Sequence, residues 1–293
     1  MERFGNIVFI PGPRDGRYPY CNSILIDDEI RALIDPGSDE EELLKLSRGK
    51  TEIVISSHYH EDHRAYLHLF DDSELYAHPT EFPCYISINS FLDYYGLLGR
   101  RHEKAWRDLV LDRFNYRERE PDRAIADGDV LEFGRTSLAV IHTPGHSPGH
   151  CCFHFPREGV LFLGDLDMTS FGPWYGDRVS DIDQTIESIN RILEVDAQIY
   201  ISSHAPVIRG GIVKLARDYA GVIYGREEKL LEYLREPRTM DEIVNQWICY
   251  GKRRAPEHFF EFGERGLMKK HLERLEKHGR VDLQDDGRYY LNG

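Results

Sequence analysis

A histidine-rich loop at residues 56–63 constrains this chain more than any other feature of its sequence. It reads Ser-Ser-His-Tyr-His-Glu-Asp-His and directly follows the apolar run Ile-Val-Ile at 53–55. In an extended chain the side chains of His58 and His60 point to the same side, with Cα atoms about 6.6 Å apart, so both imidazoles can converge on one ion. Asp62 and His63 follow at once and can serve a second ion beside the first. The loop therefore predicts a metal site at the C-terminal end of a buried strand.

Three further residues that can bind a metal ion follow predicted strands later in the chain. His146 lies in the turn-rich segment Thr-Pro-Gly-His-Ser-Pro-Gly-His at 143–150, Asp165 follows a strand at 160–163, and His204 follows a strand at 198–201. A lone histidine in a loop is usually a solvated or hydrogen-bonded residue. Seven nitrogen or oxygen ligands at four strand ends are harder to explain in that way, and they suit two cations that share a bridging carboxylate.

The first 220 residues alternate strand-like and helix-like segments, which predicts sheets covered by helices with the chemistry on loops at strand ends. A hairpin is predicted at 23–35, a short amphipathic helix at 39–46 and a longer helix at 181–193. Residues 83–119 form a helix-rich insertion that we expect to cap a pocket. We assign residues 1–221 to a catalytic domain of the α/β (α+β) class.

After residue 221 the pattern changes to three helices and a hairpin. The helices are predicted at 227–234, at 239–247 behind the capping box Thr-Met-Asp-Glu, and at 264–278, and the hairpin at 280–292. This order predicts a winged-helix-like domain over residues 222–293. Its 14 Lys and Arg balance 14 Asp and Glu, so it lacks the basic surface of a typical nucleic-acid-binding module. We expect it to pack on the catalytic domain or to form a homodimer, with salt-dependent RNA binding as the rival hypothesis.

The net charge and the cysteines of the chain restrict which class of partner and which cellular compartment we expect. The formal net charge of −14 repels nucleic acid at long range, which favours a small-molecule substrate. No apolar run approaches the roughly 20 residues of a membrane helix, and the first residues do not resemble a secretory signal. The five cysteines form no Cys-x-x-Cys pair, which favours a reducing compartment. We therefore expect a cytoplasmic protein without membrane contact.

The motif set resembles that of the metallo-β-lactamase superfamily over about residues 4–220, and the segment 143–150 is most similar to its glyoxalase II-like branch. The resemblance implies an αββα sandwich with a dinuclear site at one edge. Asp35, which on sequence alone is equally a turn-forming acid before Pro-Gly, would support a ligand histidine from behind. The implied ligands are His58, His60 and His146 for the first metal, Asp62, His63 and His204 for the second, and Asp165 as the bridge.

The resemblance also implies a reaction, in which Asp62 and Asp165 count as catalytic. A hydroxide bridging two divalent ions would attack an ester, thioester or lactone. Two divalent ions with two aspartates and that hydroxide leave the cluster near +1, which favours a small anionic substrate. Zinc suits this ligand set, and iron or manganese also fit it. Endoribonuclease or phosphodiesterase activity, persulfide oxidation at a single iron, and a metal-bound sensor without turnover are the alternatives.

Aromatic residues near these ligands are candidates for the substrate pocket. Trp174 and Tyr175 lie in the loop 168–177, shortly after Asp165, and Tyr94 lies in the helix-rich insertion. A loop anchored beside the metals borders the substrate, and its aromatic rings can stack on it. The competing interpretation for each of the three is packing in the core.

Overall fold

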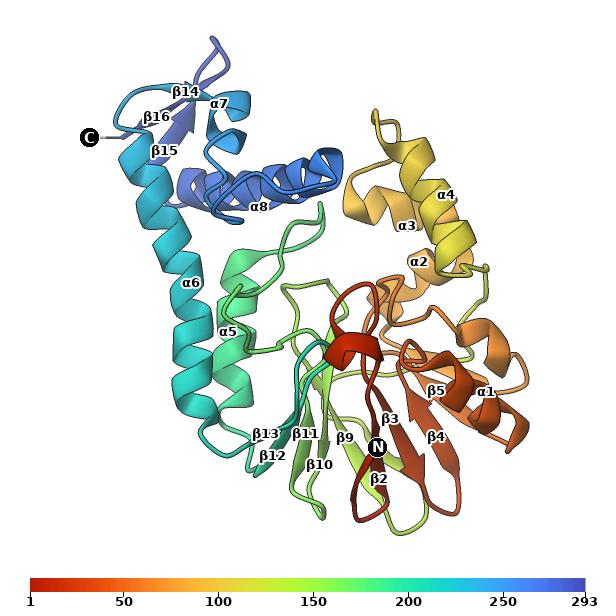
Figure 1. Ribbon diagram of the computed structural model, residues 1–293. Helices are drawn as coiled ribbons and strands as arrows, with labels where there is room; N and C mark the ends of the chain where they lie inside the picture. Colours follow the sequence, from red (N-terminus) through yellow and green to blue (C-terminus); the bar gives the residue numbers. More distant parts are fainter. Residues whose placement is uncertain (293) are drawn as a thin grey trace.

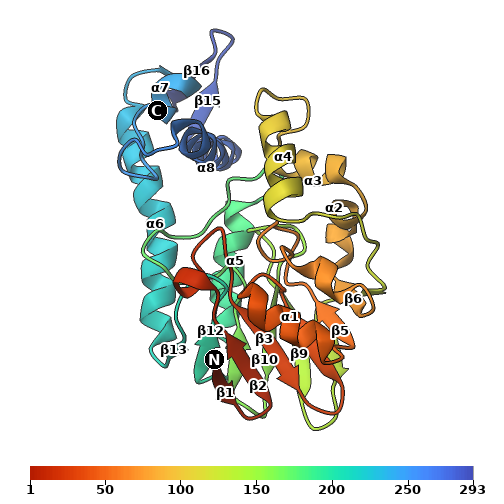
Figure 2. The same cartoon turned by 45° about the vertical axis from the view of Figure 1, so that its right-hand side comes forward.

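The computed structural model describes residues 1–292 and has two facing mixed sheets with helices on their outer faces (Figure 1, Figure 2). The first sheet follows the order of the chain: β1 (Glu2–Phe4), β2 (Ile7–Ile10), β3 (Ser23–Asp27), β4 (Arg31–Ile34), β5 (Ile53–Ile55), β6 (Glu74–Ala77) and β7 (Arg123–Ala124). The second sheet has the spatial order β13 (Ile208–Arg209), β12 (Ile199–Ile201), β11 (Val160–Phe162), β10 (Cys151–Phe155), β9 (Ser137–His142) and β8 (Val130–Glu132).

Helices cover both outer faces, which completes the predicted αββα sandwich. The second sheet is covered by α5 (Ile182–Ile192) and α6 (Ile212–Tyr233), whose apolar residues form a core with that sheet. The predicted helix-rich insertion is present as three helices. The first sheet is covered by α1 (Glu40–Arg48), whereas α2 (Phe82–Ile86), α3 (Ile88–Tyr95) and α4 (Glu103–Arg113) rise beyond the upper ends of its strands in Figure 1. Short 3-10 turns lie at η1 (Pro13–Gly16), η2 (Leu67–Phe70) and η3 (Pro79–Glu81).

Side chains along each strand point alternately to the two faces of the sheet, so apolar residues contribute both to the core between the sheets and to the core beneath the helices. In β2, Ile7 and Phe9 face the second sheet, whereas Val8 and Ile10 face the helices. Successive side chains of a strand point to opposite faces, so a strand that is buried on both faces reads as a continuous apolar run. The central core lies between the two sheets, and it places their strand ends opposite each other.

The strand directions bring the predicted ligand loops to one edge of the sandwich. Strands β4, β5 and β6 are parallel in the first sheet. In the second sheet β9 and β11 are both antiparallel to β10, and β12 is parallel to β11, so β9, β11 and β12 run the same way. Loops that follow strands of one direction emerge at one edge of a sheet. The loops after β4, β5, β9, β11 and β12 carry all the sequence-predicted ligands and Asp35.

The C-terminal region begins as a continuation of α6. This helix runs unbroken past residue 221, because Gly221 and Gly225 face open space and do not interrupt it. The predicted helix at 227–234 is therefore the second half of a longer helix, and the predicted boundary at 221 is not a linker. The division into two domains and the winged-helix type remain predictions. The region further contains α7 (Met240–Val244), α8 (Glu257–Lys277) and a small sheet of β14 (Arg238–Thr239), β16 (Arg288–Leu291) and β15 (Val281–Leu283).

Helix α8 packs directly on the sandwich formed by the earlier part of the chain. Arg274 donates to Asp183 of α5 over 2.6 Å, and Lys270 donates to the carbonyl of Arg178 over 2.7 Å. These two contacts join α8 to α5 and to the loop that precedes α5. All five cysteines are free thiols, and none of the helices within residues 1–292 has the length and apolar character needed to cross a membrane.

We expect the substitution Phe162→Ala to lower the free energy of unfolding by about 3–5 kcal/mol, because it leaves a cavity between the two sheets. Phe162 is fully buried there, and its ring stacks on Phe153 with centroids 6.3 Å apart. Urea unfolding followed by circular dichroism measures the change. The control Val213→Ala, at a site 54% exposed on α6, should change it by no more than about 0.5 kcal/mol. Equal effects of the two substitutions would contradict the assignment of this core.

Candidate metal centre

All seven predicted ligands meet at this edge, in two clusters. Within each cluster the candidate ligand atoms lie within 4.8 Å of one another. The first cluster comes from the loops after β5, β9 and β11, and the second from the loops after β5 and β12. The first contains His58, His60, His146 and Asp165, and the second contains Asp62, His63 and His204.

The first cluster has the spacing of a metal coordination shell. His146 Nε2 lies 3.1 Å from His58 Nε2 and 3.0 Å from His60 Nδ1. It also lies 3.4 Å from Asp165 Oδ2. Ligands about 2.1 Å from a tetrahedral ion lie about 3.4 Å from one another. Three imidazole nitrogens and one carboxylate oxygen therefore suit one ion between them.

The second cluster shares the carboxylate of Asp165 with the first. Asp165 Oδ1 lies 3.0 Å from His63 Nε2 and 3.2 Å from His204 Nε2. Asp62 Oδ2 lies 3.6 Å from His204 Nε2. One carboxylate thus reaches both groups of nitrogens, which is the position of a bridging ligand between two ions.

Three atoms of this site are buried without a hydrogen-bond partner: Asp62 Oδ2, His63 Nε2 and Asp165 Oδ1. Buried polar atoms are nearly always paired in folded proteins, because an unpaired one loses its hydration without compensation. A cation between these residues would satisfy all three atoms at once. The residues present therefore fit a pair of metal ions.

Asp35 orients two ligand rings from behind. Its Oδ2 accepts hydrogen bonds from His63 Nδ1 over 2.9 Å and from Ser57 Oγ over 2.6 Å. Since Ser57 donates its proton to Asp35, its oxygen accepts from His58 Nδ1 over 3.0 Å. A ring that donates from one nitrogen keeps a lone pair on the other, and here the other nitrogen faces the clusters. Asp35 has the supporting position that the resemblance implied.

Asp177 supports His60 in the same way, and sequence reasoning did not single it out. Its Oδ2 accepts from His60 Nε2 and from the Tyr59 hydroxyl, each over 2.7 Å, so His60 faces the cluster with Nδ1. Its Oδ1 accepts from Trp174 Nε1 over 3.1 Å. Asp177 is fully buried and lies 117 residues from His60 in the chain. No local pattern in the sequence marks a carboxylate whose partner is that distant.

Backbone carbonyls orient the remaining two rings. His146 Nδ1 donates to the carbonyl of Trp174 over 3.0 Å, and His204 Nδ1 donates to the carbonyl of Gly16 over 2.7 Å. Both rings therefore present Nε2 as the free nitrogen. A carbonyl carries no side-chain signature, so these partners could not be found in the sequence.

Glu81 and His150 tie the ligand loops together, and the sequence analysis named neither as a site residue. The carboxylate of Glu81 accepts from the backbone N–H of Tyr59 over 2.9 Å and from that of Gly149 over 2.6 Å, so it joins the loops after β5 and β9. His150 Nε2 accepts from the backbone N–H of Asp165 over 3.0 Å. His150 was visible as the second histidine of the segment 143–150, but its partner was not.

Burial keeps part of the site neutral. It lowers the pKa of His58, and it lowers the pKa of His146 to about 3, against the opposing charge of Asp165. Both rings are therefore unprotonated at neutral pH, which is the form that binds a metal ion.

Carboxylates reverse this effect at three other rings. Burial opposes a charge on His63, but Asp165, Asp62 and Asp35 outweigh it and raise the pKa of His63 well above its usual value. Burial opposes a charge on His60, but Asp177 outweighs it and raises the pKa of His60 to about 8. Burial likewise opposes a charge on His204, but Asp165 outweighs it and raises that pKa to about 10. Without metal, all three rings are protonated at pH 7.

The predicted pocket aromatics take different positions. Tyr175 is fully buried and its hydroxyl lies 2.8 Å from Nε2 of His271 in α8, so it packs between the catalytic part and α8. Its assignment to an open substrate pocket is thus not supported by its position. Trp174 is half-buried beside the first cluster, and Tyr94 is half-buried on α3, with its ring edge-on to Tyr59 at 5.5 Å. These two remain candidates.

The clusters are more accessible from one side than from the other. The side chains of His58 and His63 are fully buried, whereas those of Asp165 and His204 are 10% and 15% exposed. Solvent therefore reaches the site on the side of Asp165 and His204.

A sequence profile of the Metallo-beta-lactamase superfamily matches residues 17–204. Among curated relatives, a hydroxyacylglutathione hydrolase of Francisella philomiragia is 28% identical over 182 residues, which are 60% of this chain and 58% of that protein. An acyl-coenzyme A thioesterase of Homo sapiens is 27% identical over 150 residues, which are 48% of this chain and 51% of that protein. The matches thus span little more than half the length of either relative.

Two solved structures match nearly the whole chain. A metallo-beta-lactamase family protein of Thermus thermophilus has a TM-score of 0.75 at 22% identity, with 98% of this chain and 99% of that one covered. A beta-lactamase domain protein of Burkholderia ambifaria has a TM-score of 0.73 at 20% identity, with 100% and 93% covered. Identities this low establish a shared fold and leave the reaction open.

We expect metal binding at pH 7 to release about three protons per protein, because His60, His63 and His204 must lose theirs before they can bind an ion. Titration calorimetry with zinc, in buffers of different ionisation enthalpy, measures this number. The release should fall as pH rises above about 8 and fall again above about 10, as first His60 and then His204 become neutral in the metal-free protein. A binding enthalpy that does not depend on the buffer at pH 7 would contradict these protonation states.

We expect Asp177→Asn to weaken metal binding by about 10-fold to 100-fold, because an amide holds the His60 ring less firmly than a carboxylate does. Competition with a chromogenic chelator measures the affinity. Asp72→Asn, at an exposed site outside the two clusters, is the matched control and should have no effect. An unchanged affinity in the folded Asp177 variant would show that this hydrogen bond does not position the ligand.

Proposed function

The chain belongs to the metallo-β-lactamase superfamily, and from this premise we propose that it is a metal-dependent hydrolase of thioesters. One observation carries the proposal: two clusters of histidine and aspartate share the carboxylate of Asp165. Shared ligands hold two cations close enough to act on one substrate bond.

The thioester class rests on the names of the relatives. A hydroxyacylglutathione hydrolase and an acyl-coenzyme A thioesterase both act on a thioester by name, and both align with this chain. Their acyl groups and carriers differ, so what they share is the bond that is cleaved. The match spans only part of each relative, and the carrier used by this chain is therefore a separate question.

The two ions would be held by the two clusters, with Asp165 between them. When bound, the ions would supply a hydroxide at neutral pH and positive charge for the substrate oxygen. Histidine and carboxylate ligands suit zinc, and they also accept iron or manganese. The buried atoms without partners at Asp62, His63 and Asp165 support this occupancy.

The chain itself supplies orientation and charge balance. Asp35, Asp177 and two carbonyls fix the tautomer of each ligand ring before a substrate arrives. Asp35 and Asp177 also add two negative charges to those of Asp62 and Asp165, so four carboxylates face the +4 of two divalent ions. The site then has less surplus positive charge than the ligand shell alone suggested. An anionic group of a substrate would therefore bind to basic side chains outside the metal site.

We expect Asp165→Ala to lower kcat/KM for a thioester by about a thousandfold or more and to reduce the bound metal, because the substitution removes the ligand common to both clusters. Hydrolysis of S-acylglutathione and of an acyl-coenzyme A, followed by release of the thiol, measures the activity, and elemental analysis measures the metal. Asp196→Ala, at an exposed aspartate on the same part of the chain, is the control. Full activity after removal of metal with a chelator would contradict the proposal, as would a thiol release that requires oxygen.

A further inference from the structure

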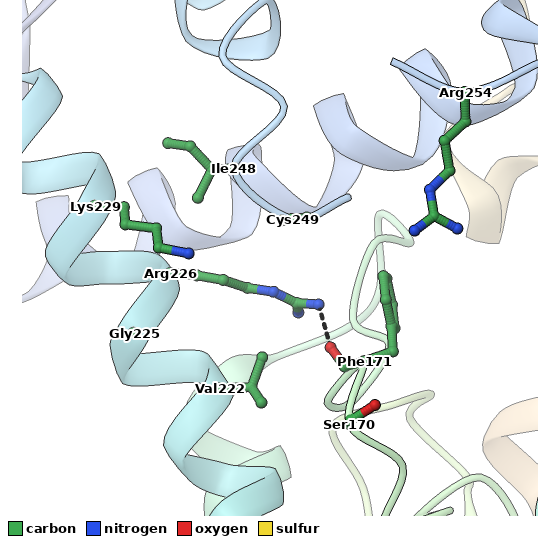
Figure 3. A pocket seen from close by; sticks show the side chains of 9 residues that line it. All are labelled: Ser170, Phe171, Val222, Gly225, Arg226, Lys229, Ile248, Cys249 and Arg254. Atoms are coloured by element: carbon green, nitrogen blue, oxygen red, sulfur yellow. Dashed lines mark hydrogen bonds between the residues drawn. The ribbon is translucent and has the colours of Figure 1, made fainter. Parts of the chain in front are cut away.

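A pocket of about 530 Å³ lies between α6, the segment before α8 and the loop that follows Asp165 (Figure 3). None of its lining residues is a candidate metal ligand. A volume of this size accommodates a small organic molecule. Its apolar walls include Phe171, Val222 and Ile248, and its basic side chains are Arg226, Lys229 and Arg254.

The pocket has a strongly basic lining in an acidic protein. Three cationic side chains line it and no carboxylate does, although the chain as a whole has a net charge of −14. In Figure 3 the guanidinium of Arg226 lies between the amine of Lys229 and the guanidinium of Arg254. Within residues 1–292 none of the three side chains forms an ion pair with an acid. Their charge is therefore available to a ligand.

Glu264 is the acid nearby whose charge acts on Arg226, but it does not form an ion pair with it. Glu264 on α8 is fully buried, and its two oxygens accept from the backbone N–H groups of Cys249 and Tyr250 over 3.0 and 3.1 Å. Its carboxylate caps a turn of the backbone and forms no hydrogen bond with the guanidinium. The charge of Glu264 thus stabilises the Arg226 guanidinium from a distance, and no carboxylate in the part of the chain that the structure describes forms an ion pair with it.

Arg226 is a rigid part of this pocket. It is only 3% exposed, and it donates to the carbonyl of Phe171 over 2.6 Å and to the hydroxyl of Tyr175 over 2.8 Å. A third and longer bond of 3.4 Å reaches the carbonyl of Pro173. A guanidinium has five N–H donors, and these three bonds leave two of them unused. An arginine fixed in this way binds an oxyanion with little loss of side-chain entropy.

We infer that this pocket binds an organic diphosphate of the nucleotide class. A row of three cations matches more than one phosphate group, and arginine matches phosphate oxygens in pairs. The ring of Phe171 forms one wall, with the Arg226 guanidinium 4.7 Å from its centroid on one face, so a base can stack only on the face that this guanidinium leaves free. A monovalent carboxylate would leave two of the three cations unused.

The pocket is connected to the metal centre by one short loop. Arg226 holds this loop at Phe171 and Tyr175, and the carbonyl of Trp174 between them accepts from the ligand His146. A diphosphate in the pocket therefore lies beside the segment that orients a metal ligand. It is either the nucleotide end of the thioester carrier, which rests on the proposed function, or a free nucleotide.

The inference is tested by measuring the binding of ADP to the metal-loaded full chain, with titration calorimetry at low ionic strength. We expect Lys229→Glu and Arg254→Glu each to weaken ADP binding by at least about tenfold, since each removes a charge-assisted contact and adds repulsion. Arg217→Glu makes the same charge change at an exposed position of the same helix outside the pocket, and it should leave the affinity unchanged. Added salt should weaken binding, and AMP should bind less tightly than ADP.

Kinetics separate the two sources of the diphosphate. If it belongs to the substrate carrier, the Lys229 and Arg254 variants raise KM for an acyl-coenzyme A and leave KM for S-acylglutathione unchanged. If it is a free nucleotide, ADP alters hydrolysis of both thioesters in the unmodified protein and not in the variants.

The binding experiment does not depend on thioester hydrolysis. A protein that binds ADP at this pocket but cleaves no thioester would refute the proposed function alone. If ADP does not bind, the assignment of this pocket to a nucleotide diphosphate is wrong. It is also wrong if ADP binds equally well to the Lys229 and Arg254 variants, because ADP would then bind at the metal ions.

Discussion

The carboxylate of Asp165 is the interaction on which the rest of the site depends. Its oxygens lie within 3.8 Å of ring nitrogens from His58, His63, His146 and His204. Burial would raise the pKa of this carboxyl, but the surrounding histidines hold it well below its usual range. A negative charge thus persists inside the protein because histidines from three separate loops converge on it. The loops can converge only where strands of both sheets end at the same edge.

The C-terminal region contributes to this arrangement through the loop at 171–178. Tyr175 of the loop contacts His271 of α8, and a Cβ added to Gly266 of α8 would lie 2.3 Å from the carbonyl of Gly176. Only glycine allows an approach this close. The same loop carries Asp177, which orients His60. The region after α6 therefore supports a ligand from outside the catalytic layers, and the geometry of the metal centre is a property of the whole chain.

Sequence reasoning succeeded where the signal was local and periodic. Apolar runs with Gly and Pro at their ends located most of the strands, and ligand-type residues directly after them located the site. It did not show that Tyr175 is buried, because α6 and α8 supply that environment. It also did not show that α6 continues past residue 221, where the change in sequence character predicted a domain boundary. Local composition does not record which side of a helix a distant element covers.

The sequence by itself determined the chemistry of the site. The types and spacing of its ligands, and their positions at strand ends, are present in the order of the residues, because side-chain chemistry and strand period are local properties. Only the tertiary structure decided which nitrogen of each ring faces the clusters, that Asp177 stands behind His60, and that three cations surround a pocket beside the ligand loop. These features depend on contacts between segments more than 20 residues apart, such as the 117 residues between His60 and Asp177. Their distances are set by how the layers pack, and no short stretch of sequence contains that information.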